Sequence, residues 1–274
     1  MKKFAAVLFF IALGFGHAQE AQSDRVVVAF SDPSRPKMLK ASLLNGGITV
    51  KGYDGKDAII ESRGRSGEPR RRRPERADGM RRLDVGGSGL QVEESDNTIT
   101  VGVGWRGINN DTDIVIQVPY NTSVKLSTTN GGDLVVDHVT GDVELNNTNG
   151  NATATHISGS AVVHALNGRV LASLDRVTPD KPMSFSSLNG DIDVTLPADV
   201  KARVKLKSDN GEIYSDFDVK LDAGARQPIV EDSRSERGRY KVRFDRATYG
   251  TINGGGPEVQ LTTFNGNIYI RKAK

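Results

Sequence analysis

The most informative part of this 274-residue sequence is residues 130–168, which read NGGDLVVDHVTGDVELNNTNGNATATHISGSAVVHALNG. An Asn-Gly pair opens this segment, returns at Asn149-Gly150 and closes it at Asn167-Gly168. The pair then recurs at Asn189-Gly190 and Asn210-Gly211, so the spacings from residue 130 onward are 19, 18, 22 and 21 residues. An internal period near 20 residues indicates a repeat architecture.

A second turn lies about halfway between successive Asn-Gly pairs. The segment Asp137–Gly141 aligns without gaps with Thr155–Gly159, and the two end in Thr-Gly and Ser-Gly. Apolar residues alternate with polar ones beside these turns, as at Leu134 and Val136. A period of two is typical of a strand with one buried and one solvated face. Each unit is therefore predicted to hold two short strands, and we find no helical periodicity after the N-terminal segment.

Two architectures fit such units. In a sandwich, the Asn-Gly pairs would close antiparallel hairpins. In a solenoid, each unit would stack on the previous one at about 4.8 Å. The gapless alignment favours the second arrangement. We predict an all-β fold, a β-solenoid or β-roll of short strands with repeats of about 20 residues and Asn-Gly corners.

Stacking of the units places equivalent residues in columns along the axis. Val139, Ile157 and Val177 are expected to form a buried apolar column, and His138, His156 and Arg176 an exposed one. The corner asparagines are expected to form a structural ladder, in which the side-chain amides of successive units hydrogen-bond to one another. The predicted ladder consists of Asn130, Asn149, Asn167, Asn189 and Asn210.

Both ends of the chain resemble less regular units. Residues 258–270 are expected to form the last one, where the charges of Arg271, Lys272 and Lys274 would discourage pairing of its open edge. Asn45-Gly46 opens an early unit in the same way as Asn130-Gly131. Further strands are expected at Asp57–Ser62, Leu90–Glu94, Thr98–Val103 and Asp113–Val118.

The first 18 residues resemble a secretory signal peptide. Lys2 and Lys3 precede an apolar run from Phe4 to Phe15, which is too short to cross a bilayer of about 30 Å, and Ala18 ends a small-residue cleavage site. We therefore expect domains at 1–18 (signal peptide) and 19–274 (a single β-repeat domain), with an arginine-rich loop inserted at about 63–84. The expected location is the periplasm or the cell surface, with no membrane span after cleavage.

The inserted loop carries most of the positive charge. The whole chain has 37 basic and 34 acidic side chains, and loss of Lys2 and Lys3 leaves a net charge of +1. Between Glu61 and Asp84, nine arginines face five acids, so this segment contributes +4 and the rest −3. The candidate electrostatic contact residues are Arg63, Arg65, Arg70, Arg71, Arg72, Arg73, Arg76, Arg81 and Arg82.

Two interpretations of this loop remain open. Clustered arginines could bind phosphates of lipid A, anionic phospholipid or acidic polysaccharide. A solvated insertion that keeps the protein soluble is the alternative. Nucleic acid is not an expected partner, because the run has no interleaved aromatic side chains.

Three segments carry a resemblance to a known family. They are Leu196–Ile213, Gly254–Ile268 and Gln117–Gly131. Together they resemble the bacterial putative-adhesin family, a β-repeat domain of unknown function, over most of residues 38–272. The resemblance implies an exported β-solenoid or β-roll, and it brings no catalytic motif onto this chain. It does not extend to the arginine-rich loop.

Several side chains could support chemistry. His138 and His156 would lie about 5 Å apart on adjacent units and could share zinc, but a third ligand is missing. Asp191 and Asp193 share a strand face, as paired carboxylates of glycosidases can. Acidic or amide residues that follow the corners resemble calcium repeats in part, although the glycine pattern does not match. They are Asp133, Asn151, Asp191, Glu212 and Asn267.

Ordinary surface and turn chemistry explains each of these groups, so we expect no catalytic residue, no metal and no cofactor. The absence of cysteine excludes a disulfide framework and a thiolate site. The leading hypothesis is an exported, non-enzymatic binding or scaffolding protein of the cell envelope. Its partner would be an anionic envelope polymer or lipid, or an envelope protein. The alternatives are a polysaccharide-active enzyme on a solenoid and a structural or regulatory protein that pairs through strand edges.

Overall fold

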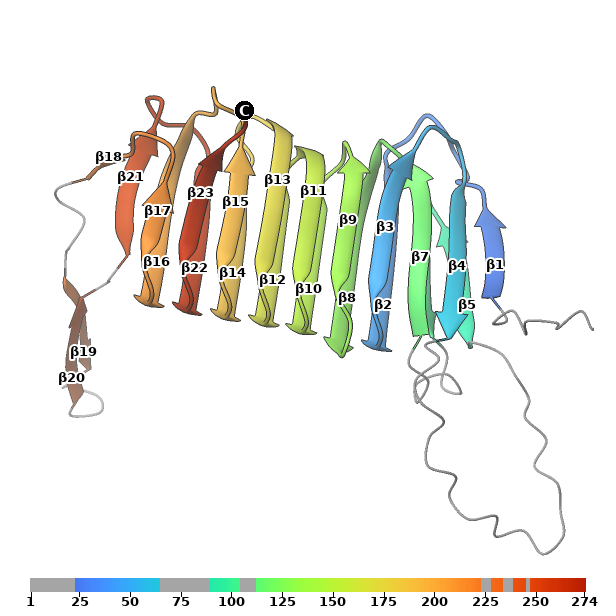
Figure 1. Cartoon of the computed structure of the whole chain (residues 1–274), viewed down its shortest axis with the longest axis horizontal. Coiled ribbons are helices and arrows are strands. Elements are labelled where there is room, and N and C mark those ends of the chain that lie inside the picture. Colours follow the sequence, from blue (N-terminus) through green and yellow to red (C-terminus); the bar gives the residue numbers. More distant parts are fainter. Residues whose placement is uncertain (1–22, 65–88, 104–111, 223–227, 234–238, 245–246) are drawn as a thin grey trace, which may run out of the picture.

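The computed structural model describes residues 23–64, 89–103, 112–222, 228–233, 239–244 and 247–274. Every regular element in these residues is a strand. Two long sheets lie one behind the other, and their strands are stacked side by side along the longest axis of the molecule (Figure 1). The predicted all-β solenoid is confirmed. No helix in the described residues is apolar and long enough to cross a membrane.

The strands of the described residues form two long sheets and one separate pair. In spatial order, the first sheet contains β1 (Ser23–Val28), β4 (Ala58–Gly64), β7 (Thr112–Pro119), β3 (Ile48–Tyr53), β9 (Leu134–Val139), β11 (Ala152–Gly159), β13 (Val170–Val177), β15 (Ile192–Leu196), β23 (Ile268–Lys272) and β17 (Ile213–Ser215). The second contains, in the same way, β18 (Lys220–Leu221), β21 (Thr248–Ile252), β16 (Ala202–Asn210), β22 (Glu258–Asn265), β14 (Met183–Asn189), β12 (Ala161–Asn167), β10 (Val143–Asn149), β8 (Thr122–Asn130), β2 (Lys37–Asn45), β6 (Thr98–Val103) and β5 (Leu90–Ser95). The separate pair consists of β19 (Pro228–Ser233) and β20 (Arg239–Phe244).

Each repeat contributes one strand to each sheet, and the Asn-Gly corner connects the two. Equivalent strands pair in parallel and in register, so that Asn149 of β10 lies opposite Asn130 of β8 and Asn167 of β12. In the first sheet, β11 pairs in parallel with β9 and β13. Parallel stacking of whole units excludes the sandwich of antiparallel hairpins as the arrangement of these repeats.

The apolar side chains that alternate along the strands meet between the two sheets. Leu126, Leu145 and Val163 follow one another on β8, β10 and β12, and all are buried. The described core is one continuous cluster that runs through every unit. Complete burial of a Leu, Ile or Val side chain stabilises a fold by about 1.5–3 kcal/mol. The columns of the solenoid therefore supply a core that needs no disulfide.

The N-terminal part is less regular, as the sequence predicts. The four further strands lie close to their expected positions, as β4, β5, β6 and β7. Here β4 pairs antiparallel with β1 and β7, and β5 pairs antiparallel with β6. The expected signal peptide at 1–18 and nearly all of the expected arginine-rich loop lie outside the described residues, so the domain boundaries stay predictions.

The expected position of the C-terminal unit is wrong. It does not end the stack, because β22 lies between β14 and β16, and β23 lies between β15 and β17. Figure 1 shows this dark red unit inside the stack. The inserted strands gain a parallel neighbour on both sides instead of one. Arg271 therefore does not protect an edge, and its guanidinium instead pairs with Asp193 of β15.

The expected column of Val139, Ile157 and Val177 is also wrong in its last member. Ile157 lies opposite Val139 on one side and Leu174 on the other. Val177 pairs with Gly159, because the register between β11 and β13 shifts twice, and Val177 is only partly buried. For the same reason Arg176 pairs with Ser158 and does not continue the histidine column.

The close approach of successive corners gives the first prediction. A Cβ on Gly168 would lie 2.0 Å from the carbonyl oxygen of Gly150 in the preceding unit, and backbone atoms cannot move aside. We expect Gly168→Ala to lower the free energy of unfolding by about 2–3 kcal/mol in chemical denaturation. The matched control is Gly102→Ala, whose Cβ would find only Ser42 O at 3.8 Å. Its unfolding free energy should stay within about 0.5 kcal/mol of wild type, and equal losses in both variants would contradict the prediction.

Candidate functional site

A continuous column of asparagine amides runs along the Asn-Gly corner. Each Nδ2 donates to the Oδ1 of the preceding unit, at 2.9 Å from Asn167 to Asn149 and 2.8 Å from Asn189 to Asn167. Because the C-terminal unit is inserted, Asn265 lies between Asn189 and Asn210. The column is, in order, Asn45, Asn130, Asn149, Asn167, Asn189, Asn265 and Asn210.

The structure thus brings together the five asparagines of the predicted ladder and adds Asn45 and Asn265. Both of the added residues precede a glycine, so the Asn-Gly pattern that predicted the other five could have identified them as well. Their place in the column could not be read from the sequence, since Asn265 is 76 residues from Asn189. Asn253, which also precedes a glycine, stays outside the ladder and donates to Val200 O.

Two further polar columns flank the asparagines. Inside the corner, side chains two residues before the asparagine donate to a glycine carbonyl of the adjacent unit, as Ser187 Oγ does to Gly168 O at 2.9 Å. Outside it, carboxylate or amide oxygens accept a backbone amide, as Asp133 Oδ1 does from Asn151 N at 2.8 Å. Asn151 and Asp191 do the same, and Asn267 accepts the amide of Glu212. These residues, whose pattern partly resembles calcium repeats, bind the corners to one another.

The ladder gives the second prediction. Asn167→Ala removes one side-chain hydrogen bond that Asn167 donates and one that it accepts, so we expect a loss of about 1–2 kcal/mol in unfolding free energy. Asn210→Ala is the matched variant at the end of the column, where the amide donates to Asn265. It should cost about half as much in the same denaturant titration, because one hydrogen bond is lost instead of two, and an equal cost would mean that the ladder hydrogen bonds do not account for the loss.

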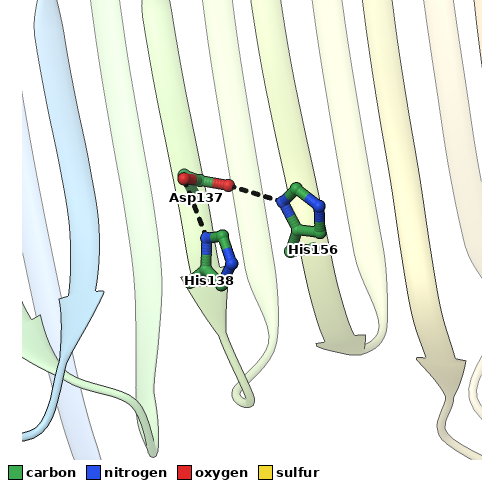
Figure 2. Close-up of side chains that lie close together, drawn as sticks. All are labelled: Asp137, His138 and His156. Atoms are coloured by element: carbon green, nitrogen blue, oxygen red, sulfur yellow. Dashed lines mark hydrogen bonds and ion pairs between the residues drawn. The ribbon is translucent and has the colours of Figure 1, made fainter.

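A cluster of Asp137, His138 and His156 lies on adjacent strands of the first sheet (Figure 2). Nδ1 of His138 is 2.8 Å from Oδ2 of Asp137, and Nδ1 of His156 is 2.9 Å from Oδ1. The two imidazole rings stack with centroids 4.2 Å apart and planes inclined by 24°. Thr155 Oγ1 donates to Oδ1 of the same carboxylate at 2.8 Å. Both rings are about half exposed to solvent.

The local backbone explains why these side chains meet. His138 and His156 both adopt left-handed conformations, with φ of 57° and 52°. Histidine tolerates this region better than most residues other than glycine. Strict alternation would point Asp137 and His138 to opposite faces, but one left-handed residue turns the second side chain outward as well. Val139 and Ile157 then return to the core, where both are fully buried.

The charges of the cluster are coupled. Partial burial of Asp137 acts to raise its pKa, but hydrogen bonds from His156, His138 and Thr155 outweigh this and lower the pKa to about 2. Conversely, the hydrogen bond to Asp137 raises the pKa of His156 above its ordinary value of 6.5, and Asp175 acts in the same direction. The carboxylate is therefore ionised at neutral pH and stabilises a cation beside it.

This coupling gives the third prediction. In protein kept free of metal by a chelator, Asp137→Asn should lower the pKa of His156 toward 6.5, because the ionised acceptor is lost. The pKa is measured by NMR titration of the imidazole signals. Asp191→Asn is the control, since Asp191 lies at the Asn-Gly corner and asparagine can still accept the amide of Asn267. A His156 pKa that does not change in Asp137→Asn would refute the coupling.

The two carboxylates considered for glycoside hydrolysis, Asp191 and Asp193, both make hydrogen bonds that hold neighbouring units together. Asp193 is 5% exposed, and its oxygens accept bonds from Arg169 Nη2 at 2.8 Å and from Arg271 Nε at 2.7 Å. Asp191 accepts the backbone amide of Asn267 at 2.8 Å. Two guanidinium groups thus neutralise Asp193 and connect three neighbouring units, which leaves this carboxylate poorly placed for acid–base chemistry.

A shallow hollow of about 440 Å³ lies beside the ends of β13 and β15 and near the start of β22. Acidic and basic side chains line it together, namely Asp175, Arg176, Asp180, Asp199 and Lys201. Of the nine predicted contact arginines, Arg63 lies in β4, and its backbone is opposite Ser23 and Asp113. The other eight lie outside the described residues.

The fold and these columns define a β-solenoid repeat protein in which corner amides connect the units. The model of the Toastrack DUF4097 family matches residues 128–271, more than half of the chain. The chain belongs to this family, which agrees with the resemblance drawn from the sequence.

Two crystal structures are similar over most of their length. One is a putative cell adhesion protein from Clostridium sporogenes, with 14% identity, a TM-score of 0.43, and coverage of 92% of this chain and 99% of the other. The second is a putative adhesin from Bacteroides fragilis, with 13% identity, a TM-score of 0.38, and coverage of 92% and 97%. No curated protein matches the chain significantly.

Proposed function

We propose that this protein is an exported, non-enzymatic binding or scaffolding protein of the cell envelope. The observation that carries this proposal is the parallel, in-register stacking of the units. Such stacking repeats outward-facing side chains at a strand spacing of about 4.8 Å over the length of the sheets. A long, regular face of this kind suits contact with a polymer or an extended protein surface. The signal peptide expected at residues 1–18 supports export.

The arginine-rich segment is the proposed contact for an anionic partner. It holds nine of the chain's arginines within 20 residues, from Arg63 to Arg82, whereas the rest of the mature chain has a net negative charge. Guanidinium groups bind phosphate and carboxylate with paired hydrogen bonds. A phosphorylated envelope lipid or an acidic polysaccharide is the partner chemistry that this composition favours.

The fourth prediction tests this contact. Purified protein should bind vesicles that contain anionic phospholipid or lipopolysaccharide, and binding should weaken as salt rises. Replacement of Arg70, Arg71, Arg72 and Arg73 by glutamine should reduce binding by at least about a hundredfold, because each arginine near an anionic surface contributes about 1 kcal/mol. The control replaces four exposed lysines, Lys40, Lys51, Lys220 and Lys274, by glutamine and so changes the net charge equally.

Binding that falls equally in both variants would mean that net charge alone attracts the protein to the surface. Binding that falls in neither variant would make the arginine-rich segment a solvated insertion. Cosedimentation with vesicles at two salt concentrations separates these results, and unchanged thermal unfolding shows that the variants are folded.

A polysaccharide-active enzyme is the second candidate, and the hollow beside β13 and β15 favours it. Asp175, Asp199 and Lys201 bring acids and a base to one concave surface, which acid–base cleavage of a sugar chain requires. The test is the release of new chain ends from envelope polysaccharides. Product formation that disappears in Asp175→Asn and Asp199→Asn would replace the binding function by catalysis, whereas no product with wild type would remove this candidate.

A further inference from the structure

We propose that Asp137, His138 and His156 form a binding site for one divalent transition-metal ion of the zinc type. The site lies on the outer face of the first sheet, where β9 and β11 run side by side (Figure 2). None of its three residues is one of the predicted contact arginines or lines the hollow, so it can be tested separately from the proposed envelope contact.

The first argument is the identity and convergence of the donor atoms. Two imidazole nitrogens and a carboxylate are ligands that zinc prefers, and each residue offers a donor atom within 4.8 Å of the others. Both Nδ1 atoms already point to the two oxygens of one carboxylate, at 2.8 and 2.9 Å. The two histidines therefore have a third ligand, which the sequence pattern did not reveal. It is Asp137, the residue before the first histidine, and not a residue of the next unit.

The second argument is the small movement that coordination needs. Zinc–ligand bonds of about 2.0–2.1 Å in a tetrahedron place donor atoms about 3.3 Å apart. The donor atoms here lie within 4.8 Å of one another, and each Nδ1 is 2.8 or 2.9 Å from a carboxylate oxygen, so each separation needs to change by at most about 1.5 Å. Both imidazoles are about half exposed and can rotate without disturbing the core. Their backbones are fixed on adjacent paired strands, which keeps the loss of entropy on binding small.

The third argument is the ability of both rings to turn a lone pair toward an ion. An ionised carboxylate only accepts hydrogen bonds, so an Nδ1 that bonds Asp137 does so as a donor. When an ion lies between these atoms, a neutral imidazole carries its proton on Nε2 and coordinates through the Nδ1 lone pair.

The ligand types also define which ions fit. Calcium and magnesium bind chiefly to oxygen donors, so two imidazoles disfavour them. Zinc, cobalt, nickel and copper accept imidazole readily. Three protein ligands leave the remaining coordination position of the ion for water, which makes the site an open one.

The fifth prediction concerns metal binding to the purified, tag-free protein after treatment with a chelator. Calorimetry with zinc chloride should give one ion per chain, and cobalt chloride should give visible absorption bands of a four-coordinate ion that zinc then removes. His138→Asn and His156→Asn should each weaken zinc binding at least about tenfold. Asparagine is chosen because it also tolerates the left-handed backbone of both positions.

His164→Asn is the matched control, since this exposed histidine lies on β12 of the other sheet and contacts Ser186 Oγ. It should bind zinc like wild type, and magnesium chloride should give no heat with any variant. Thermal unfolding in chelator checks that all three variants fold. Zinc binding that is absent in wild type, or equal in wild type and in the His138 and His156 variants, would overturn the proposal whatever the result of the vesicle experiments.

Discussion

The whole structure depends on the close contact between successive Asn-Gly corners. At nearly all of these corners the glycine after the asparagine meets the backbone of the adjacent unit, with no space for a Cβ; at the Asn130 corner, Gly132 takes this place instead of Gly131. The asparagine amides beside the glycines continue the hydrogen bonding of the sheets along the axis. Once the corners are in register, both strands of each unit are placed against their neighbours. The apolar columns between the sheets then form without further adjustment.

Because the corners and the inward side chains hold the units together, the outward side chains of the strands have few structural requirements. The corner needs small and amide-bearing residues, and the inward positions need apolar ones, but the outward positions of a strand need only solubility. In the described part of the chain, the chemistry-bearing residues accordingly lie on outward positions and beside turns. Asp137, His138 and His156 are on an outer face, and the charged hollow is beside loop residues such as Pro197. A binding function can therefore change without loss of the fold.

The sequence predicted the features that depend on local pattern. The Asn-Gly period and the alternation at residues such as Leu134 and Val136 were enough for the fold class and the strands. Long-range pairing was not predictable, because the position of Asn265 between Asn189 and Asn210 depends on contacts 55 and 76 residues apart. The role of Asp137 was missed for another reason. A rule of strict alternation cannot show that one left-handed residue at His138 turns two successive side chains to the same face.

The inserted C-terminal unit poses a further physical requirement. Its strands enter between units that are earlier in the chain, so the stack cannot be completed in sequence order. Asp193 secures the insertion, because Arg169 of the unit before it and Arg271 of the inserted unit both bond to its buried carboxylate. Without Arg271, Oδ1 of this buried carboxylate would lose its guanidinium donor, and only Arg169 would remain on Oδ2. The second guanidinium arrives with the last unit, so this ion cluster becomes complete only when the C-terminal strands occupy their place.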